Sequence, residues 1–316
     1  MKFCYLGIDG GGTKTVGVAV DEQGNVLCRK EESSINYCSV GMENALHALS
    51  RIADALIQEA GCPAVSLAIG SSALDERIRD GLYREFINRI SNDEVLGKIE
   101  HVEVHSDARM ALLAACGKER GALLISGTGV MGLAADGSSL HSVAGWGDVI
   151  GDRGSGYAIG LAGISAALDY TDGLNTDAEA LFLAMCEFYS IQSAAELIAL
   201  IYSPDFDKSR IAAFCACVCA LAERKDARSV EILNDAAEDL VRYCISLGNF
   251  LGQKPFPLAF YGSVLTKNEY IRNRVTNALK VRLPQAEIIT PTLAAEDAAA
   301  LYALERTKNE QSTRIL

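Results

Sequence analysis

The sequence has few prolines, no long apolar run and no segment rich in lysine or arginine. Six prolines among 316 residues, with no low-complexity tract, argue against long disordered linkers. No apolar run approaches the roughly 20 residues of a membrane-spanning helix. The formal net charge is -12, so the basic surface that nucleic acids and anionic membranes require is missing. We therefore expect neither as a partner.

Two further features bear on the cellular compartment. Only Phe3 to Ile8 lie between Lys2 and Asp9, which is too short for the apolar core of a signal peptide. The ten cysteines include no C-x-x-C pair and lie in apolar segments. Even the densest group (Cys215, Cys217 and Cys219) would point in different directions on a helix. We therefore expect buried free thiols in a soluble cytoplasmic protein, without disulfides or a thiol metal site.

A glycine-rich turn near the start of the chain carries the first functional signal. Tyr5 to Ile8 read as a buried strand ending at Asp9, three glycines (Gly10, Gly11 and Gly12) follow, and Thr15 to Val20 resume a strand. Backbone N–H groups without neighbouring Cβ atoms can approach an anion closely, and Thr13 and Lys14 add a hydroxyl and a cation. The pattern predicts a hairpin that binds a polyphosphate. The alternative is a tight hairpin in which Asp9 merely forms the turn.

Two nucleotide-binding motifs are excluded by their context. The P-loop requires a lysine where Thr13 stands, and it requires a helix that is not predicted here. A G-x-G-x-x-G pattern runs from Gly127 to Gly132. Val130 to Ala135 look like a strand, whereas the dinucleotide fingerprint opens a helix. This second stretch therefore predicts another phosphate-binding hairpin, turned by Gly127, Thr128 and Gly129.

The order of elements predicts two α/β domains. The first, residues 1–117, has a three-stranded meander followed by alternating helices and strands. The second, residues 118–316, repeats the meander, carries a helical insert over about 176–251, and ends in a helix that is expected to pack on the first domain. This alternation predicts mixed sheets covered by helices.

Several other residues have both a functional and a structural interpretation. Asp107 ends a strand and begins a helix, so it could cap that helix or accept a hydroxyl proton. Asn36 could shape a turn or bind a ligand. Trp146 lies between two glycines, which weakens the alternative that it packs in a core. Asp148 and Asp152 could bind ligand hydroxyls or cap the helix near Tyr157. Gly262 and Ser263 follow a strand, and they could either line a nucleoside site or form a generic turn.

Together these segments resemble the N-acetylglucosamine kinases of the BadF/BadG/BcrA/BcrD ATPase group, within the actin, Hsp70 and sugar-kinase superfamily. The similar segments are GIDGGGTKT (7–15), SINY (34–37), SDARMALLAA (106–115), LLISGTG (123–129), GWGDVIGDRGSGY (145–157) and YGSV (261–264). The resemblance implies two actin-like, ribonuclease H-like domains with mixed five-stranded sheets and an ATP cleft between them. It also implies a homodimer.

The resemblance further implies roles for individual residues. Asp9 would belong to a Mg²⁺ site, and Asp107 would be the catalytic base. The residues implied to bind ATP are Gly10, Gly11, Gly12, Thr13, Lys14, Gly127, Thr128, Gly129, Gly262 and Ser263. Those implied to contact an amino sugar are Asn36, Ser71, Asp107, Thr128, Gly145, Trp146 and Asp152. Ser71 lies where relatives often have a Gly-rich or Gly-Ala turn, and Glu296 to Ala298 replace a Gly-Ala pair of the last helix.

The resemblance implies an ATP-dependent kinase acting on the 6-hydroxyl of N-acetylglucosamine, N-acetylmuramic acid or glucosamine. The same group contains ATPase activators that carry a [4Fe–4S] cluster between subunits and act on a protein partner. Such a cluster needs thiolates near the nucleotide. The loops 126–132 and 145–156 contain no cysteine, which favours the kinase. A nucleotide-binding scaffold without chemistry is the third alternative, and it leaves Asp9 and Asp107 unexplained.

Overall fold

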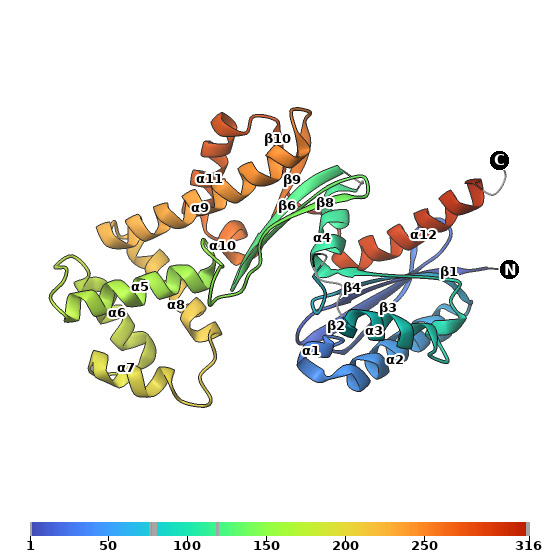
Figure 1. Ribbon diagram of the computed structural model, residues 1–316, viewed down its shortest axis with the longest axis horizontal. Coiled ribbons are helices and arrows are strands. Elements are labelled where there is room, and N and C mark those ends of the chain that lie inside the picture. The colour runs from blue at the N-terminus through green and yellow to red at the C-terminus, as the bar shows by residue number, and fades with distance from the viewer. Residues whose placement is uncertain (1, 76, 78–80, 118–119, 314–316) are drawn as a thin grey trace. The chain divides into compact units, whose positions relative to one another are not determined.

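The computed structural model describes residues 2–75, 77, 81–117 and 120–313 (Figure 1). The chain divides into two compact units. Unit 1 comprises Met1–Glu119 and Pro291–Leu316, and unit 2 comprises Arg120–Thr290. The C-terminal segment therefore belongs to the same unit as the N-terminus, although most of the chain separates them.

Unit 1 contains a mixed five-stranded sheet, as predicted. Its strands, in the order β3-β2-β1-β4-β5, are β1 (Cys4–Gly10), β2 (Lys14–Val20), β3 (Val26–Ser33), β4 (Ala64–Ser71) and β5 (His101–Ser106). The first three form an antiparallel meander, and β4 and β5 run parallel to β1. The central strands are apolar on both faces, as a sheet covered on both sides requires.

Helices cover both faces of this sheet (Figure 1). They are α1 (Tyr37–Val40), α2 (Met42–Ala60), α3 (Gly81–Ser91), the short 3-10 helix Leu96–Lys98, α4 (Asp107–Cys116) and α12 (Ala295–Thr313). Leu6 and Ile8 of β1 pack in one buried cluster with residues of α2, whereas Tyr5 packs on the opposite face with α4 and α12. The alternation of side chains along β1 thus supplies two cores.

The backbone of α12 lies unusually close to β1. A Cβ atom added to Gly7 would lie 2.2 Å from both the amide nitrogen of Ala300 and the carbonyl oxygen of Glu296. Small side chains at Ala299, Ala300 and Ala303 are buried at this contact. The helix can therefore pack closely on the strand because the side chains on both sides of the contact are small or absent.

A charged network ties α12 to β5. Glu103 of β5 accepts hydrogen bonds from the Tyr302 hydroxyl and from Nε of Arg306, both at 2.8 Å, and its carboxylate lies 3.1 Å from Nε2 of His105. These hydrogen bonds lower the pKa of Glu103 from 4.5 to about 2 despite partial burial, with the bond to His105 contributing most. The ionised carboxylate is thus the form that the folded protein prefers.

Glu103→Gln should remove a pH-dependent part of the stability. A carboxylate with a depressed folded pKa stabilises the fold above its unfolded pKa near 4.5 and ceases to do so as the pH falls through about 2. Because the group is partly exposed, we expect a loss of about 1–2 kcal/mol at neutral pH. Urea unfolding at pH 7 and pH 2.5 would check this: the difference between the two proteins should be largest at pH 7 and should become much smaller at pH 2.5, close to the folded pKa. A difference that does not change with pH would contradict the assignment.

Unit 2 repeats the sheet of unit 1. Its strands are β6 (Arg120–Ser126), β7 (Val130–Asp136), β8 (Ser139–Ala144), β9 (Phe256–Tyr261) and β10 (Ala286–Ile289), in the order β10-β9-β6-β7-β8. β6, β7 and β8 form an antiparallel meander, and β9 and β10 extend the sheet in parallel with β6. Both units therefore share one strand order and one pattern of directions, which confirms the predicted pair of mixed five-stranded sheets.

The helices of unit 2 form one large core with its sheet. They are α5 (Gly156–Thr171), α6 (Glu179–Tyr189), α7 (Ala194–Ile201), α8 (Ser209–Glu223), α9 (Ala227–Leu251), α10 (Ser263–Thr266) and α11 (Glu269–Arg282). α10 starts at Ser263, and Asn268 caps a separate α11 by accepting a hydrogen bond from the amide of Ile271 at 2.9 Å.

Among the described residues no single helix is long and apolar enough to cross a membrane. The bent pair α6 and α7 meets the criteria of length and composition only when both helices are taken together. Leu181, Met185 and Leu197 of that pair are buried in the core of unit 2.

Candidate functional site

The carboxyl ends of three parallel strands meet at one edge of the sheet in unit 1. In the register of β1, β4 and β5, Asp9 lies beside Gly70, and Ser71 lies beside Ser106. Asp9 and Asp107 therefore lie on either side of β4. A Cβ atom on Gly70 would lie only 3.5 Å from Cα of Asp107 and 2.7 Å from the Met110 side chain. Because Gly70 has no side chain, α4 begins close to the sheet edge.

Asp107 is not the cap of α4. Ser106 is the N-cap residue, and its Oγ accepts a hydrogen bond from the amide of Arg109 at 3.2 Å. Asp107 is the first helical residue, and its Oδ1 accepts from the amide of Ala108 at 2.6 Å. The alternative in which Asp107 serves as N-cap is therefore wrong, because the serine before it performs that role. The location of Asp107 at the strand end thus needs another explanation.

Both carboxyl groups at this edge hold their protons more tightly than usual. Burial, followed by the negative charges of Asp107 and Glu296, raises the pKa of Asp9 to about 6. Burial also raises the pKa of Asp107, and this effect outweighs the hydrogen bond from the Ala108 amide, which lowers that pKa. Within the described residues the side chain of Asp9 has no hydrogen-bond partner. This edge therefore concentrates negative charge that a bound cation would neutralise.

The hairpin between β1 and β2 presents an open glycine. The amide of Gly11 donates to the carbonyl of Lys14 at 3.0 Å and closes the turn. A Cβ atom on Gly10 would collide with the Ile35 side chain at 2.2 Å, whereas one on Gly12 would meet nothing within 4 Å. Lys14 is exposed and forms an ion pair with Glu31 at 3.1 Å. Packing thus explains why position 10 requires glycine. At Gly12 the backbone is open to solvent, so an anion could approach it.

Gly12→Ala should separate folding from ligand binding. Because the added methyl group has free space and the backbone does not require a positive φ there, we expect the free energy of unfolding to change by less than about 0.5 kcal/mol. The same methyl group should keep a phosphate away from the backbone N–H groups and weaken nucleotide binding roughly tenfold. Isothermal titration with ATP, beside thermal unfolding, would measure both. Unchanged affinity would show that this hairpin does not contact the phosphates.

Two predicted substrate contacts have clear structural roles. Asn36 caps α1: its Oδ1 accepts from the amides of Cys38 and Ser39, and its Nδ2 donates to Oγ of Ser72 at 3.0 Å. The turn-forming interpretation of Asn36 is therefore correct. Ser71 ends β4 and is fully buried, with the amide of Ala73 3.3 Å from its hydroxyl. Their contact with a sugar stays a prediction.

In unit 2 the second hairpin is anchored to the start of a helix. The amide of Gly127 donates to the carbonyl of Gly129 at 2.9 Å, which closes the turn between β6 and β7. The first amides of α5 then donate to the hairpin: Gly156 to the Gly127 carbonyl at 2.7 Å, and Tyr157 to the Thr128 carbonyl at 3.1 Å. Ser155 caps α5. The alternative in which Asp148 or Asp152 caps this helix is therefore wrong.

Asp152 instead contacts the hairpin from the loop before α5. It is buried, its backbone has a positive φ of 60°, and its Oδ1 accepts from the amide of Val130 at 3.4 Å. Its Oδ2 lies 2.8 Å from the place that a Cβ atom of Gly129 would take. A carboxylate held in a disfavoured backbone conformation is typical of functional sites. Asp148, by contrast, forms an ion pair with Lys208 at 2.6 Å.

The loop between β8 and α5 exposes its aromatic residue. Trp146 is 61% exposed, so the alternative that it packs in the core is wrong. The backbone turns with positive φ at Gly145 and Gly147, and the amide of Gly145 donates to the Val130 carbonyl at 2.9 Å. The loop is thus attached to β7 beside the glycine hairpin, and the Trp146 side chain is largely exposed.

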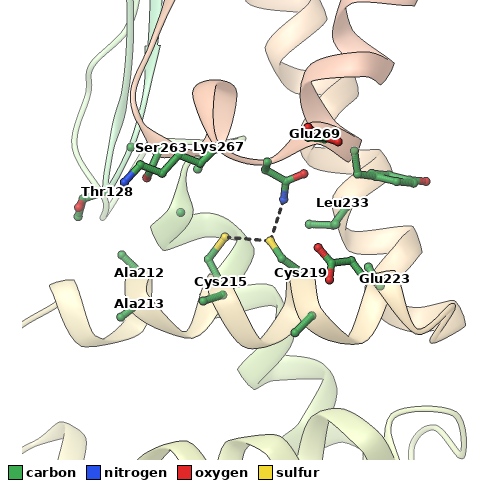
Figure 2. A pocket seen from close by; sticks show the side chains of 18 of the residues that line it. Thr128, Ala212, Ala213, Cys215, Cys219, Glu223, Leu233, Ser263, Lys267 and Glu269 are labelled. Carbon is green, nitrogen blue, oxygen red and sulfur yellow. Dashed lines mark hydrogen bonds between the residues drawn. The ribbon is translucent and has the colours of Figure 1, made fainter.

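A cavity of about 840 Å³ opens beside the second hairpin (Figure 2). Gly127, Thr128 and Ser263 line it, so three of the predicted nucleotide-binding residues share one pocket. The opposite wall is α8, and Lys267 and Asn268, which connect α10 to α11, also line the cavity. This size lies within the range of small-molecule pockets.

Sequence reasoning missed the α8 wall, because the helical segment was interpreted only as an insert. Apart from Glu223, the lining residues of α8 are small. Five of them recur three or four positions apart: Ala212, Ala216 and Ala220, with Cys215 and Cys219 between them. That periodic row of small side chains was the signal in the sequence. A helix with such a face lets a flat ligand lie against its backbone.

Gly262 is required by packing. Its φ is 81°, and a Cβ atom would lie 2.2 Å from the carbonyl oxygen of Ser126. The residue begins α10 and lets β9 pass close to the end of β6. Ser263, next in the chain, is exposed to the cavity. The tight turn and the nucleotide-binding prediction are therefore compatible.

Known proteins resemble this chain over nearly its whole length. It is 29% identical to the N-acetyl-D-glucosamine kinase of Dictyostelium discoideum, over 97% of this chain and 99% of that protein. It is 30% identical to the N-acetylmuramic acid/N-acetylglucosamine kinase of Clostridium acetobutylicum, over 92% and 94%. The crystal structure of a candidate N-acetylglucosamine kinase from Chromobacterium violaceum superposes with a TM-score of 0.70 at 22% identity, over 95% and 98%.

The similarity to the crystal structure shows the fold, whereas the two curated kinases are similar to this chain in sequence. In addition, the profile of the BadF/BadG/BcrA/BcrD ATPase family matches residues 6–303, which include both glycine hairpins, Asp107 and the α8 wall. The chain therefore belongs to the BadF/BadG/BcrA/BcrD ATPase family.

Proposed function

We propose that the protein is an ATP-dependent kinase that phosphorylates the 6-hydroxyl of an amino sugar, with N-acetylglucosamine, N-acetylmuramic acid and glucosamine as the candidate acceptors. The observation that carries this proposal is Asp107, a half-buried carboxylate at the end of β5 that neither caps α4 nor packs in the core. Support comes from the relatives named above and from a glucosamine kinase of Vibrio cholerae, 25% identical over 77% of this chain.

The proposed donor is ATP. In unit 2 the adenosine would occupy the α8 cavity, with its phosphates toward Gly127, Thr128 and Gly129 and its nucleoside near Gly262 and Ser263. In unit 1 the amides and side chains of Gly10, Gly11, Gly12, Thr13 and Lys14 would also contact the phosphates. Charge on the transferring phosphoryl group is spread over its oxygens, so preoriented amides stabilise the transition state without rearranging.

Asp107 would bind and aim the acceptor hydroxyl. Its raised pKa strengthens it as a base, and a carboxylate needs to accept the hydroxyl proton only late in phosphoryl transfer. The expected sugar contacts are Asn36, Ser71, Thr128, Gly145, Trp146 and Asp152. Because the side-chain amide of Asn36 is largely used in capping α1, we expect it to hold the loop in shape as well as to contact the sugar.

The acidic edge of unit 1 fits a divalent cation. Asp9 has no internal hydrogen-bond partner among the described residues, and its pKa is raised first by burial and then by the negative charges of Asp107 and Glu296. Mg²⁺ bound near Asp9, directly or through water, would neutralise charge on the ATP phosphates. A homodimer and a cytoplasmic location remain predictions.

A second function is compatible with the family. An ATPase activator would hydrolyse ATP to drive a change in a protein partner, and it would carry an iron–sulfur cluster between subunits. Among the described residues no group of three or more histidine, cysteine, aspartate or glutamate side chains could hold a metal ion. A cluster shared between two subunits would need fewer ligands from each, so the distinction has to come from experiment.

A coupled ADP-release assay across amino sugars, N-acetylated and not, tests the proposal. The kinase should release ADP several-fold faster with one of these sugars than without any. Protein purified anaerobically should contain no iron in stoichiometric amount. ADP release that no sugar stimulates, from a brown iron-containing protein, would support the activator instead.

A further inference from the structure

Two thiols of α8 face the proposed nucleotide pocket. Cys215 and Cys219 both line the cavity, and their sulfur atoms lie 3.8 Å apart on adjacent turns of the helix (Figure 2). Cys217 lies between them in sequence but does not line the cavity. The expectation that the cysteines of α8 point in different directions is therefore wrong for one pair, because residues four apart share a helix face.

The orientation of Asn268 makes Cys219 a hydrogen-bond acceptor. Oδ1 of Asn268 caps α11 by accepting from the amide of Ile271 at 2.9 Å. The other end of the amide must therefore be the NH₂ group, and it points at Sγ of Cys219 at 2.9 Å. A neutral thiol is a weak acceptor, whereas a thiolate is a strong one. The cap of α11 thus aims a fixed donor at this sulfur.

Cys215 supplies a second donor to the same sulfur. Because Cys219 accepts from Asn268, the sulfur–sulfur contact is best satisfied when the Cys215 S–H donates to Cys219. The hydrogen bonds from Cys215 and Asn268 lower the pKa of Cys219 against the effect of burial, while the pKa of Cys215 is raised. One thiol of the pair keeps its proton and the other becomes the nucleophile.

We propose that Cys219 is a site of covalent modification by soft electrophiles, including small disulfides such as oxidised glutathione, and that its modification competes with nucleotide. The competition rests on the proposed function, whereas the nucleophilicity does not. In the exchange, the Cys219 thiolate attacks one sulfur of the disulfide. A new S–S bond forms to the protein, the original S–S bond breaks, and a glutathione thiolate leaves.

The reaction should stop at the mixed disulfide. Side chains four apart on a helix have Cβ atoms roughly 5–6 Å apart, whereas a disulfide requires about 3.5–4.5 Å. Cys215 therefore cannot displace glutathione without distorting α8. An external thiol should reverse the modification. A glutathione moiety on Cys219 would fill the cavity between α8 and the 127–129 hairpin. It would thereby exclude the adenine base of ATP.

Iodoacetamide labelling at pH 6.5, with peptide mapping over time, tests the nucleophilicity. Cys219 should be alkylated several-fold faster than Cys38, which is exposed, and than Cys217, which lies on the same helix outside the cavity. Asn268→Asp should keep the cap of α11 and replace the amide donor by a carboxylate, so we expect labelling of Cys219 to slow by about tenfold. Equal or slower labelling of Cys219 than of Cys38 would overturn the proposal.

Oxidised glutathione and ATP test the competition. One glutathione should add to each chain of the natural protein, and none should add to a Cys219→Ser variant. The modified protein should not bind ATP until dithiothreitol removes the glutathione. Saturating ATP should protect Cys219 from iodoacetamide. If ATP binds by calorimetry yet leaves labelling unchanged, the competition is refuted. If ATP does not bind at all while Cys219 still reacts first, the proposed function fails and the nucleophilic site stands.

Discussion

Asp107→Asn is expected to lower the turnover number by about 10²- to 10⁴-fold while ATP and sugar affinities change little. The asparagine can still occupy the first position of α4, because Ser106 provides the cap. It cannot accept a proton, and it orients the acceptor hydroxyl less strongly than a carboxylate does. Steady-state kinetics with the preferred sugar would measure the turnover, and calorimetry would measure both affinities.

Glu43→Gln is the matched control for this variant. Glu43 is likewise an acidic residue in the first turn of a helix, but it is exposed and lies on α2. Its loss should leave turnover within about twofold of the natural protein. If Asp107→Asn behaved like Glu43→Gln, the carboxylate would have no part in the chemistry, and its position at the strand end would need another cause.

Gly7→Ala should destabilise unit 1 by about 3 kcal/mol or more. The new methyl group would lie 2.2 Å from two backbone atoms of α12, and neither can move unless the helix shifts off β1. Overpacking against flexible side chains costs roughly 1–3 kcal/mol, and a backbone neighbour leaves less room for relaxation. Chemical unfolding followed by circular dichroism should show a lower midpoint.

Gly12→Ala is the control for the effect of Gly7→Ala. It is the same substitution in the same glycine-rich segment, placed where a methyl group meets nothing. We expect each variant to lose a different property. Gly7→Ala should lower the free energy of unfolding, whereas Gly12→Ala should weaken nucleotide binding. Equal stability of both variants would mean that α12 is not packed on β1 as described.

Much of the fold follows from local pattern. The hairpins turned by residues 10–12 and 127–129 were predicted because strand-like apolar residues adjoin their glycines, and both are observed as β1–β2 and β6–β7. The end of α2 likewise coincides with a local signal, Gly61, which has a positive φ of 66°. These features depend on interactions between neighbours in the sequence, so the sequence alone expresses them.

The features that were missed or misread depend on residues far apart in the chain. The requirement for glycine at position 7 comes from α12, almost 300 residues later. The pocket wall on α8 is recognisable only when the turn at Gly127 and Thr128, α10 and α11 meet it. The alternative in which Asp107 caps α4 placed the cap one residue too late. Serine and aspartate are both good caps, and only the backbone conformation shows which of them precedes the helix.

Identification of the product tests the central claim most directly. The natural protein, incubated with ATP, Mg²⁺ and the preferred amino sugar, should yield ADP and a sugar phosphate in equal amounts, and ³¹P and ¹³C NMR should place the phosphate on the 6-hydroxyl. The Asp107→Asn variant should yield almost none. ADP accumulating with inorganic phosphate and no phosphorylated sugar would contradict the account, because the γ-phosphoryl group would then have been transferred to water.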